Sequence, residues 1–223
     1  MAQRIAIRRP AELAPYIDHT ILRPDAGRAD LLRWCDEARQ HGFRSVCVNP
    51  WHVPLVHERL AGSGVLTCSV VAFPFGATPT AAKVAETEIV VAAGADEVDM
   101  VIPLGALKDG ALDVVRADIA AVKRACGNRV LKVIIETCVL TDEQKVTACR
   151  LSQEAGADFV KTSTGYGSAG AMAEDVALMR RTVGDGMGVK ASGGIRSTAD
   201  AIRMIEAGAS RIGASASIAI VSG

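Results

Sequence analysis

The stretch "EAGADFVKTS" (residues 154–163) leads from the end of a predicted helix into a predicted strand that carries a lysine. Glycine tolerates the left-handed backbone conformation that commonly ends a helix, and Phe159-Val160 begins a short apolar run typical of a buried strand. The same helix-to-strand joint recurs as "AAGAD" (92–96) and "EAGAS" (206–210). Three copies of one joint indicate a fold built from repeated βα units.

Eight short apolar runs, separated by longer Ala-rich segments, are candidates for strands. They cover residues 16–20, 45–48, 67–73, 97–102, 131–137, 159–163, 188–192 and 211–215. Eight strands that alternate with helices predict an α/β fold, the (β/α)8 TIM barrel, as a single domain over residues 1–223. The alternative is an open doubly wound sheet, but no strand candidate is followed by the GxGxxG loop of dinucleotide-binding sheets.

Two of the intervening segments carry clear helical signals. Residues 80–93 and 141–155 begin at Thr80 and Thr141, which are candidate N-caps. In the first of these helices the apolar positions among small residues are Val84, Ile89 and Val91.

The balance of charge argues against several classes of partner. The chain has 25 basic and 25 acidic residues, so no excess of positive charge favours a nucleic acid or a membrane surface. No apolar run approaches the roughly 20 residues that span a bilayer. The first ten residues, "MAQRIAIRRP", carry positive charge, but no apolar core or cleavage site follows them, and we expect no targeting signal.

The cysteines and histidines do not form a recognisable metal site. The six cysteines occur singly, without a CxxC pair, which is typical of free thiols in a reducing compartment. The four histidines have no HExxH or other ligand spacing. We therefore predict a cytoplasmic protein without a metal ion.

Charged residues interrupt four consecutive strand candidates. Lys132, Lys161 and Lys190 are equally spaced along the fifth, sixth and seventh runs, and Asp99 lies in the fourth. Because side chains alternate along a strand, Asp99, Lys161 and Lys190 face the barrel interior when their apolar neighbours face the helices. A buried charge is costly unless it is paired, so these residues are expected to lie together. The alternative is a set of structural salt bridges with lysines that reach water, and for Lys132 both readings remain open.

An aspartate beside two lysines suits carbonyl chemistry. A lysine amine is a nucleophile only when it is neutral, and both burial and a neighbouring cation favour the neutral form. Such an amine forms a Schiff base with an aldehyde, whose iminium accepts electrons when a carbon–carbon bond breaks. A nearby carboxylate can move the protons, directly or through water.

Glycine-rich segments follow the last two strand candidates. They are "SGGI" (192–195) and "GASAS" (213–217). In TIM barrels the loops after strands seven and eight often bind phosphate through backbone N–H groups. Tight turns without a ligand are the alternative for either segment alone.

Five segments together resemble the deoxyribose-phosphate aldolase family, and the resemblance extends from about residue 13 to residue 217. They are "YIDHTILRPDA" (16–26), "GADEVDMVIPLGALKDG" (94–110), "LKVIIETCVLT" (131–141), "GADFVKTSTGYG" (156–167) and "VKASGGIRS" (189–197). The resemblance implies reversible cleavage of 2-deoxy-D-ribose 5-phosphate to D-glyceraldehyde 3-phosphate and acetaldehyde, through a lysine Schiff base and without a cofactor. It also implies a homo-oligomer, since relatives are commonly dimers or tetramers.

The resemblance assigns roles by position. Lys161 matches the Schiff-base lysine, Asp99 the aspartate that moves protons through water, and Lys190 the second lysine that favours a neutral nucleophile. Residues in phosphate-binding positions are Gly165, Gly193, Gly194, Gly213 and Ser215. Residues in substrate-pocket positions are Asp18, Thr20, Cys47 and Lys132, and we expect Thr162 and Thr164 to bind sugar hydroxyls.

The chain also departs from the family pattern. Many relatives have Gly-Pro-Arg-Gly after the tyrosine, whereas Tyr166 is followed by Gly-Ser-Ala-Gly, with Ala169 where the arginine would stand. Ala216 replaces a second serine, and Gly223 ends the sequence without the tyrosine-terminated tail of some relatives. A lower affinity for the phosphorylated substrate is therefore open. Two other functions are also open: a phosphate-binding isomerase or lyase that uses Asp99 as a base, and a non-catalytic barrel that binds a sugar phosphate or a partner.

Overall fold

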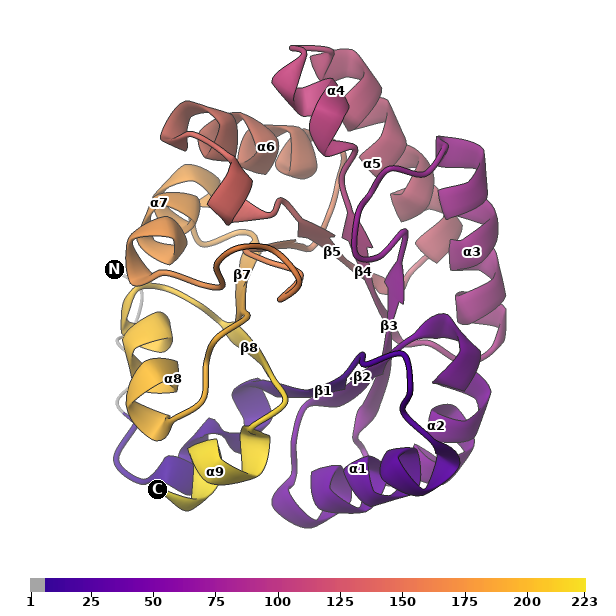
Figure 1. Ribbon diagram of the computed structural model, residues 1–223, viewed down its shortest axis with the longest axis vertical. Coiled ribbons are helices and arrows are strands. Elements are labelled where there is room, and N and C mark those ends of the chain that lie inside the picture. Colours follow the sequence, from indigo (N-terminus) through magenta and orange to yellow (C-terminus); the bar gives the residue numbers. More distant parts are fainter. Residues whose placement is uncertain (1–6) are drawn as a thin grey trace.

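The computed structural model describes residues 7–223 and shows a closed barrel of eight parallel strands in sequential order (Figure 1). The strands are β1 (Ile17–Ile21), β2 (Ser45–Val48), β3 (Leu66–Val71), β4 (Glu97–Val101), β5 (Val130–Ile134), β6 (Phe159–Lys161), β7 (Gly188–Ser192) and β8 (Arg211–Ala214). Because β8 pairs with β1, the (β/α)8 prediction is confirmed and the open doubly wound sheet is wrong. Residues 1–6 of the predicted domain lie outside the described residues.

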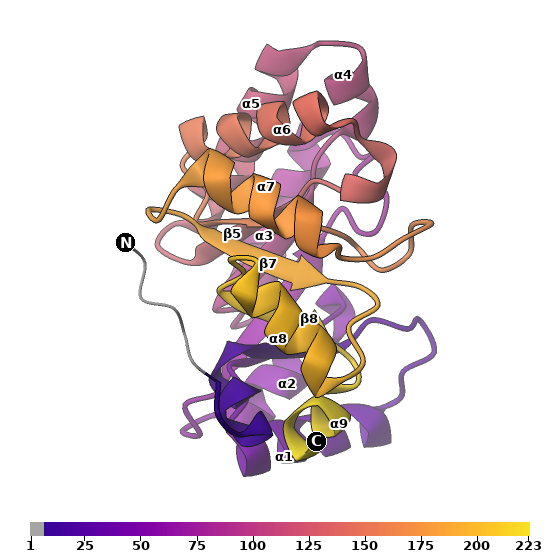
Figure 2. The same ribbon diagram turned by 90° about the vertical axis from the view of Figure 1, so that its left-hand side faces the viewer.

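Helices surround the barrel (Figure 1). They are α1 (Arg28–His41), α2 (Val53–Leu60), α3 (Thr80–Ala92), α4 (Leu104–Lys108), α5 (Leu112–Cys126), α6 (Asp142–Glu154), α7 (Ala173–Val183), α8 (Thr198–Glu206) and α9 (Ser217–Ser222), with 3₁₀ helices at Pro10–Tyr16, Pro50–His52 and Thr137–Val139. In the side view of Figure 2 the arrow of β7 points to the side on which the loops after β1 and β6 project. Among residues 7–223, no helix is both long and apolar enough to cross a bilayer.

The predicted alternation of side chains along the strands is confirmed. Val98, Val160 and Val189 are fully buried in the hydrophobic core between barrel and helices. Their neighbours Asp99 and Lys161 meet inside the barrel, where the carboxylate accepts a hydrogen bond from Lys161 Nζ at 2.8 Å. The outer core therefore stabilises the strands while the interior is left for polar side chains.

The predicted strand bounds are correct to within one or two residues, except in the fifth run. The prediction extends that strand to Thr137, but β5 ends at Ile134 and Glu136 has a φ of 52°, in the left-handed region. This turn places the Glu136 carboxylate against Thr164, which donates to it from both its backbone N–H and its hydroxyl. The apolar run continues past the strand because Ile135 is buried as well.

Helix α3 differs from its sequence-based prediction. Ile89, one of the apolar positions named in the predicted helix, is 66% exposed, and the buried positions are Lys83, Thr87 and Val90. The predicted N-cap is also wrong, since Thr80 is the first helical residue and Pro79 precedes it. By contrast, Thr141 caps α6, because its hydroxyl accepts a hydrogen bond from the Gln144 backbone N–H.

A buried ion pair between α3 and α5 explains the unexpected face of α3. The Lys83 ammonium group donates to Asp118 Oδ2 at 2.7 Å and to the Val101 carbonyl at 2.9 Å, and the Thr80 hydroxyl donates to Asp118 Oδ1 at 2.7 Å. These bonds join both helices to the end of β4. A buried lysine is tolerated at such a position because its charge is paired with a carboxylate and two of its N–H groups have acceptors.

We predict that Lys83→Met lowers the free energy of unfolding by about 3 kcal/mol, because it leaves the buried Asp118 carboxylate without its counter-ion. The double variant Lys83→Met/Asp118→Leu should recover at least half of that loss, since an apolar pair needs no counter-ion. Denaturant unfolding followed by circular dichroism measures both values. Equal stability of Lys83→Met and the parent protein would contradict this role of the pair.

Candidate active site

The carboxylate of Asp99 is the centre of the site. Its Oδ2 accepts hydrogen bonds from Lys161 Nζ at 2.8 Å and Lys190 Nζ at 2.7 Å, and its Oδ1 accepts one from Lys132 Nζ at 2.8 Å. The barrel register brings these residues together, because Asp99 is paired with Lys132 on β5, and Lys161 with Lys190 on β7. The structure therefore unites all four charged residues that the sequence places on β4–β7.

Electrostatics hold Asp99 in its ionised form. Burial raises the pKa of the Asp99 carboxyl, but the charges of Lys132, Lys161 and Lys190 outweigh burial, so the pKa lies well below its ordinary value. Burial likewise lowers the pKa of Lys132, but Asp99 and other anions raise it well above its ordinary value. For Lys190 the effect of burial is overcome by Asp18 and then by Asp99, so its pKa is raised too. Lys132 and Lys190 are therefore ammonium ions.

A second tier of charges lies toward the amino ends of the strands. Arg211 Nη1 donates to Asp18 Oδ1 and to Glu97 Oε2, both at 2.7 Å. Asp18 Oδ2 lies 2.5 Å from Lys190 Nζ, and Glu97 Oε2 lies 2.6 Å from Lys132 Nζ. Through Arg211, this second tier links side chains of β1, β4 and β8.

Sequence reasoning named Asp18 but missed Glu97 and Arg211. The signal for Glu97 was present, because a residue two positions before Asp99 on one strand faces the same side. Lys132 proves to be fully buried, so the alternative in which it reaches water is wrong. Its contacts with both Glu97 and Asp99 join the two tiers.

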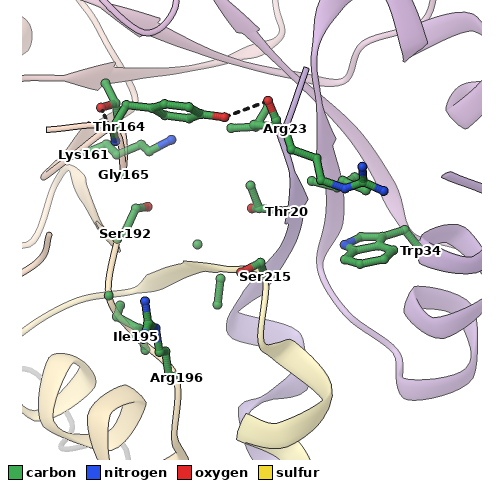
Figure 3. A pocket seen from close by; sticks show the side chains of 17 residues that line it. Thr20, Arg23, Trp34, Lys161, Thr164, Gly165, Ser192, Ile195, Arg196 and Ser215 are labelled. Atoms are coloured by element: carbon green, nitrogen blue, oxygen red, sulfur yellow. Dashed lines mark hydrogen bonds between the residues drawn. The ribbon is translucent and has the colours of Figure 1, made fainter. Parts of the chain in front are cut away.

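Lys161 differs from the other two lysines in its surroundings. It contacts one carboxylate, that of Asp99, and it lines a cavity of about 560 Å³ at the carboxyl ends of the strands. Figure 3 shows its side chain directed into this cavity, opposite Thr20. Although the residue is only 3% exposed, its amine is the one that a ligand in the cavity meets.

All five predicted phosphate-binding residues line the same cavity: Gly165, Gly193, Gly194, Gly213 and Ser215. The backbones of the loop after β6 and the turn after β7 are in contact, since a Cβ on Gly170 would lie 2.2 Å from the Gly193 carbonyl oxygen. The Ala171 N–H donates to that oxygen at 3.0 Å. The glycines therefore allow two loops to form one wall of the cavity.

The predicted substrate-pocket residues divide into two groups. Thr20 and Thr164 line the cavity. Buried residues that do not line it are Asp18, Cys47, Lys132 and Thr162. The Thr162 hydroxyl donates to the Ser192 carbonyl and accepts from the Ser192 N–H, so it joins β6 to β7. The structure thus gives Thr162 a position between strands in place of the predicted contact with a sugar hydroxyl.

Two arginines that sequence reasoning did not name also line the cavity. Arg23 is paired with Asp25 and Asp30. The Arg196 guanidinium lies beside the glycine turn (Figure 3) and makes no ion pair within residues 7–223. The motif "VKASGGIRS" contained this arginine, three residues after Gly193. Arg196 supplies a cation at the end of the cavity where the sequence suggested that one was missing.

Tyr166 also lines the cavity. Its hydroxyl donates to the Leu22 carbonyl at 2.9 Å, which joins the loop after β6 to the loop after β1. Its ring meets Phe73 edge-on, with 5.5 Å between the ring centres. These contacts fix the position of a side chain that lines the cavity together with Lys161.

The donor groups in the interior do not suit a metal ion. Cys47, Cys68 and Asp99 place one sulfur or oxygen atom each within 4.8 Å of the others. However, both Asp99 oxygens already accept from lysine ammonium groups, which would repel a further cation. The cluster is thus built to hold ammonium ions.

Comparison with known proteins identifies the family. A family model described as DeoC/LacD family aldolase matches residues 13–223. This chain belongs to that family. It is 71% identical over 211 residues to a deoxyribose-phosphate aldolase of Rhodospirillum rubrum, covering 95% of this chain and 89% of the relative. It is 59% identical over 208 residues to the enzyme of that name from Brevibacillus brevis, covering 93% and 94%.

A solved structure supports the same assignment. The tetrameric deoxyribose phosphate aldolase from Aeropyrum pernix superposes with a TM-score of 0.89 at 34% identity, covering 97% of this chain and 92% of that one. Family membership confirms the resemblance read from the motifs and identifies an aldolase, a carbon–carbon lyase. It counts against an isomerase and against a non-catalytic barrel.

We predict that Gly170→Ala lowers the free energy of unfolding by about 2 kcal/mol and reduces aldolase turnover, because its Cβ meets the rigid Gly193 backbone and separates two walls of the cavity. Gly186→Ala is the matched control, since a Cβ there has open space and the residue does not have a left-handed φ. Its stability should stay within about 0.5 kcal/mol of the parent. Denaturant unfolding and aldolase assays would contradict the close contact if both variants behaved alike.

Proposed function

We propose that this aldolase reversibly cleaves 2-deoxy-D-ribose 5-phosphate to D-glyceraldehyde 3-phosphate and acetaldehyde, with Lys161 as the Schiff-base nucleophile. One observation carries the proposal. Lys161 has its amine on the cavity while sharing the Asp99 Oδ2 atom with the ammonium group of Lys190. The names of the relatives from Rhodospirillum rubrum and Brevibacillus brevis agree with this substrate.

The first steps follow from the position of Lys161. The neutral amine attacks the aldehyde carbon of the open-chain sugar phosphate, and loss of water from the adduct forms an iminium ion. A base removes the proton of the C3 hydroxyl, and the electrons of the C2–C3 bond move into the iminium. Glyceraldehyde 3-phosphate leaves, and an enamine of acetaldehyde stays attached to Lys161.

Asp99 suits the proton transfers. Its carboxylate is ionised and lies 2.8 Å from Lys161 Nζ, so it can accept a proton directly or through a water molecule in the cavity. Protonation of the enamine at C2 regenerates an iminium, which water hydrolyses to release acetaldehyde and the free amine. Lys190 stays an ammonium ion and keeps a positive charge beside the reacting nitrogen.

The other end of the cavity suits the phosphate. The glycine turns, Ser215 and Arg196 line the cavity, and they offer backbone N–H groups, a hydroxyl and a guanidinium to a dianion. Arg196 would take the role of the arginine that relatives have after the tyrosine. Thr20 and Thr164 line the same cavity as Lys161, and their hydroxyls are available to bind the sugar hydroxyls.

We also propose a homo-oligomer, a dimer or a tetramer, in the cytoplasm. The tetramer of the Aeropyrum pernix relative supports the first part. Six cysteines without a disulfide support the second, since reducing compartments keep thiols free.

We predict that Lys161→Leu abolishes cleavage of deoxyribose 5-phosphate without lowering stability, because Asp99 keeps Lys132 and Lys190 as counter-ions. Borohydride reduction with acetaldehyde should add mass to a peptide containing Lys161 in the parent protein and to none in the variant. Lys108→Leu, at an exposed lysine on α4, is the control and should keep both activity and adduct. An active Lys161→Leu protein, or a parent protein without an adduct, would remove the Schiff base from the proposal.

We predict that Arg196→Gln raises the KM for deoxyribose 5-phosphate about tenfold, the loss expected for one charge-assisted hydrogen bond to phosphate. The kcat/KM for unphosphorylated 2-deoxyribose should change little, because that sugar has no anion to bind. Arg150→Gln, an exposed arginine on α6, controls for the loss of surface charge. Equal effects of Arg196→Gln on both sugars would contradict the phosphate contact.

A further inference from the structure

The charged side chains inside the barrel do not balance. Seven of them form one network of contacts, which we call the interior charge cluster: Asp18, Glu97, Asp99, Lys132, Lys161, Lys190 and Arg211. It contains four basic and three acidic groups, and none of the seven residues is more than 6% exposed. With every group ionised the cluster carries one excess positive charge in a region that water does not screen.

Loss of one proton from a basic group would bring the cluster to neutrality. A guanidinium stays protonated in proteins, which excludes Arg211. Lys132 has carboxylates of Glu97 and Asp99 within 2.8 Å, and Lys190 has those of Asp18 and Asp99 within 2.7 Å. Lys161 has one carboxylate contact and faces the cavity, so its ammonium form is the least stabilised and its proton has a path to water.

We propose that Arg211 is a positioning residue that acts on Lys161 through charge. Arg211 is held by Asp18 and Glu97 in the second tier, and it supplies the positive charge that the three carboxylates cannot neutralise. Lys161 then transfers a proton to water in the cavity and becomes the neutral nucleophile. This inference rests on the Schiff-base role of Lys161 proposed above.

Glu97 holds the Arg211 guanidinium in place. It accepts from both Nη1 and Nη2, at 2.7 and 3.2 Å, and the guanidinium also lies over the Phe159 ring at 5.2 Å. Neither residue lines the cavity. Any effect of Arg211 or Glu97 on catalysis must therefore pass through the other groups of the cluster.

Within residues 7–223, two thiols on β2 and β3 also face the cluster, and the Arg23, Arg196 and Tyr166 side chains share the cavity with Lys161. Cys68 donates to Asp99 Oδ1 at 3.3 Å, and burial raises the pKa of this thiol well above its ordinary value. The neighbouring Cys68 side chain, and to a lesser degree the charge of Lys190, outweigh burial and lower the pKa of Cys47. Ionisation of Cys47 is the competing way to neutralise the cluster, and the experiment separates it from loss of the Lys161 proton.

The test uses charge changes of opposite sign at one ion pair. Arg211→Gln leaves three basic and three acidic groups, so Lys161 should keep its proton to a higher pH. Glu97→Gln leaves four basic and two acidic groups, so Lys161 should lose its proton at a lower pH. The double variant Glu97→Gln/Arg211→Gln has three basic and two acidic groups, which restores the single excess positive charge. Arg211→Lys does not change the number of charges.

The measurement is the rate at which cyanoborohydride traps the acetaldehyde imine on Lys161 as a function of pH, normalised to a free lysine derivative. We expect the midpoint of the acid limb to move up by about one pH unit in Arg211→Gln and down by about one in Glu97→Gln. The double variant and Arg211→Lys should stay within a few tenths of the parent. The acid limb of kcat/KM should move in the same directions.

The outcomes separate this inference from the function on which it rests. A parent protein that forms no adduct at Lys161 overturns both. If the parent forms the adduct but the midpoints of the variants do not move, the charge mechanism alone is overturned. This is the result expected if Cys47 ionises in place of Lys161. A merely structural ion pair predicts loss of activity in both single variants and in the double variant, without opposite shifts. If Arg211→Gln does not fold, Glu97→Gln and the double variant still show whether the midpoint moves in the direction expected from the change in charge.

Discussion

The Asp99 carboxylate accepts hydrogen bonds from the Nζ atoms of three lysines, which approach it from three neighbouring strands inside the barrel. None of these lysines could be buried there alone, because an unpaired charge in a low-dielectric interior costs several kcal/mol. The barrel must therefore close in the register that brings β4, β5, β6 and β7 around one carboxylate. Fold and chemistry depend on the same contact.

The unequal sharing of carboxylates separates the roles of the lysines. Lys132 and Lys190 each contact two carboxylates at 2.8 Å or less, and they remain cations. Lys161 contacts one and lies on the cavity. A lysine whose charge is balanced by two carboxylates stays protonated and has a structural role. A lysine with one carboxylate partner, close to other cations, is better suited to act as a neutral nucleophile.

The outer shell of the barrel uses a buried lysine for a different purpose. Lys83 on α3 has one carboxylate partner, and all of its contacts are within the protein, at 2.7 and 2.9 Å. No cavity reaches it among those found in the described part of the chain. Burial and pairing alone therefore do not distinguish a catalytic lysine from a structural one, and access to a ligand does.

Much of the candidate site was readable from the sequence, because the relevant signals are local. A glycine that ends a helix, an apolar run of a few residues and the alternation of side chains along a strand placed Asp99, Lys161 and Lys190 inside a barrel. The phosphate-binding glycines followed from their position after the last two strands. The family resemblance then supplied the roles, and the comparisons agree with the family.

What the sequence could not decide depends on contacts between distant segments. The pairing of Arg211 with Glu97, the hydroxyl of Thr162 bound between strands and the exposure of Ile89 all arise from how elements meet across the barrel and its shell. Local periodicity determined the eight strands and the inward position of the catalytic lysine. Only tertiary structure decided which charges share a partner, because hydrogen bonds of 2.5–3.2 Å require an exact meeting of side chains far apart in the chain.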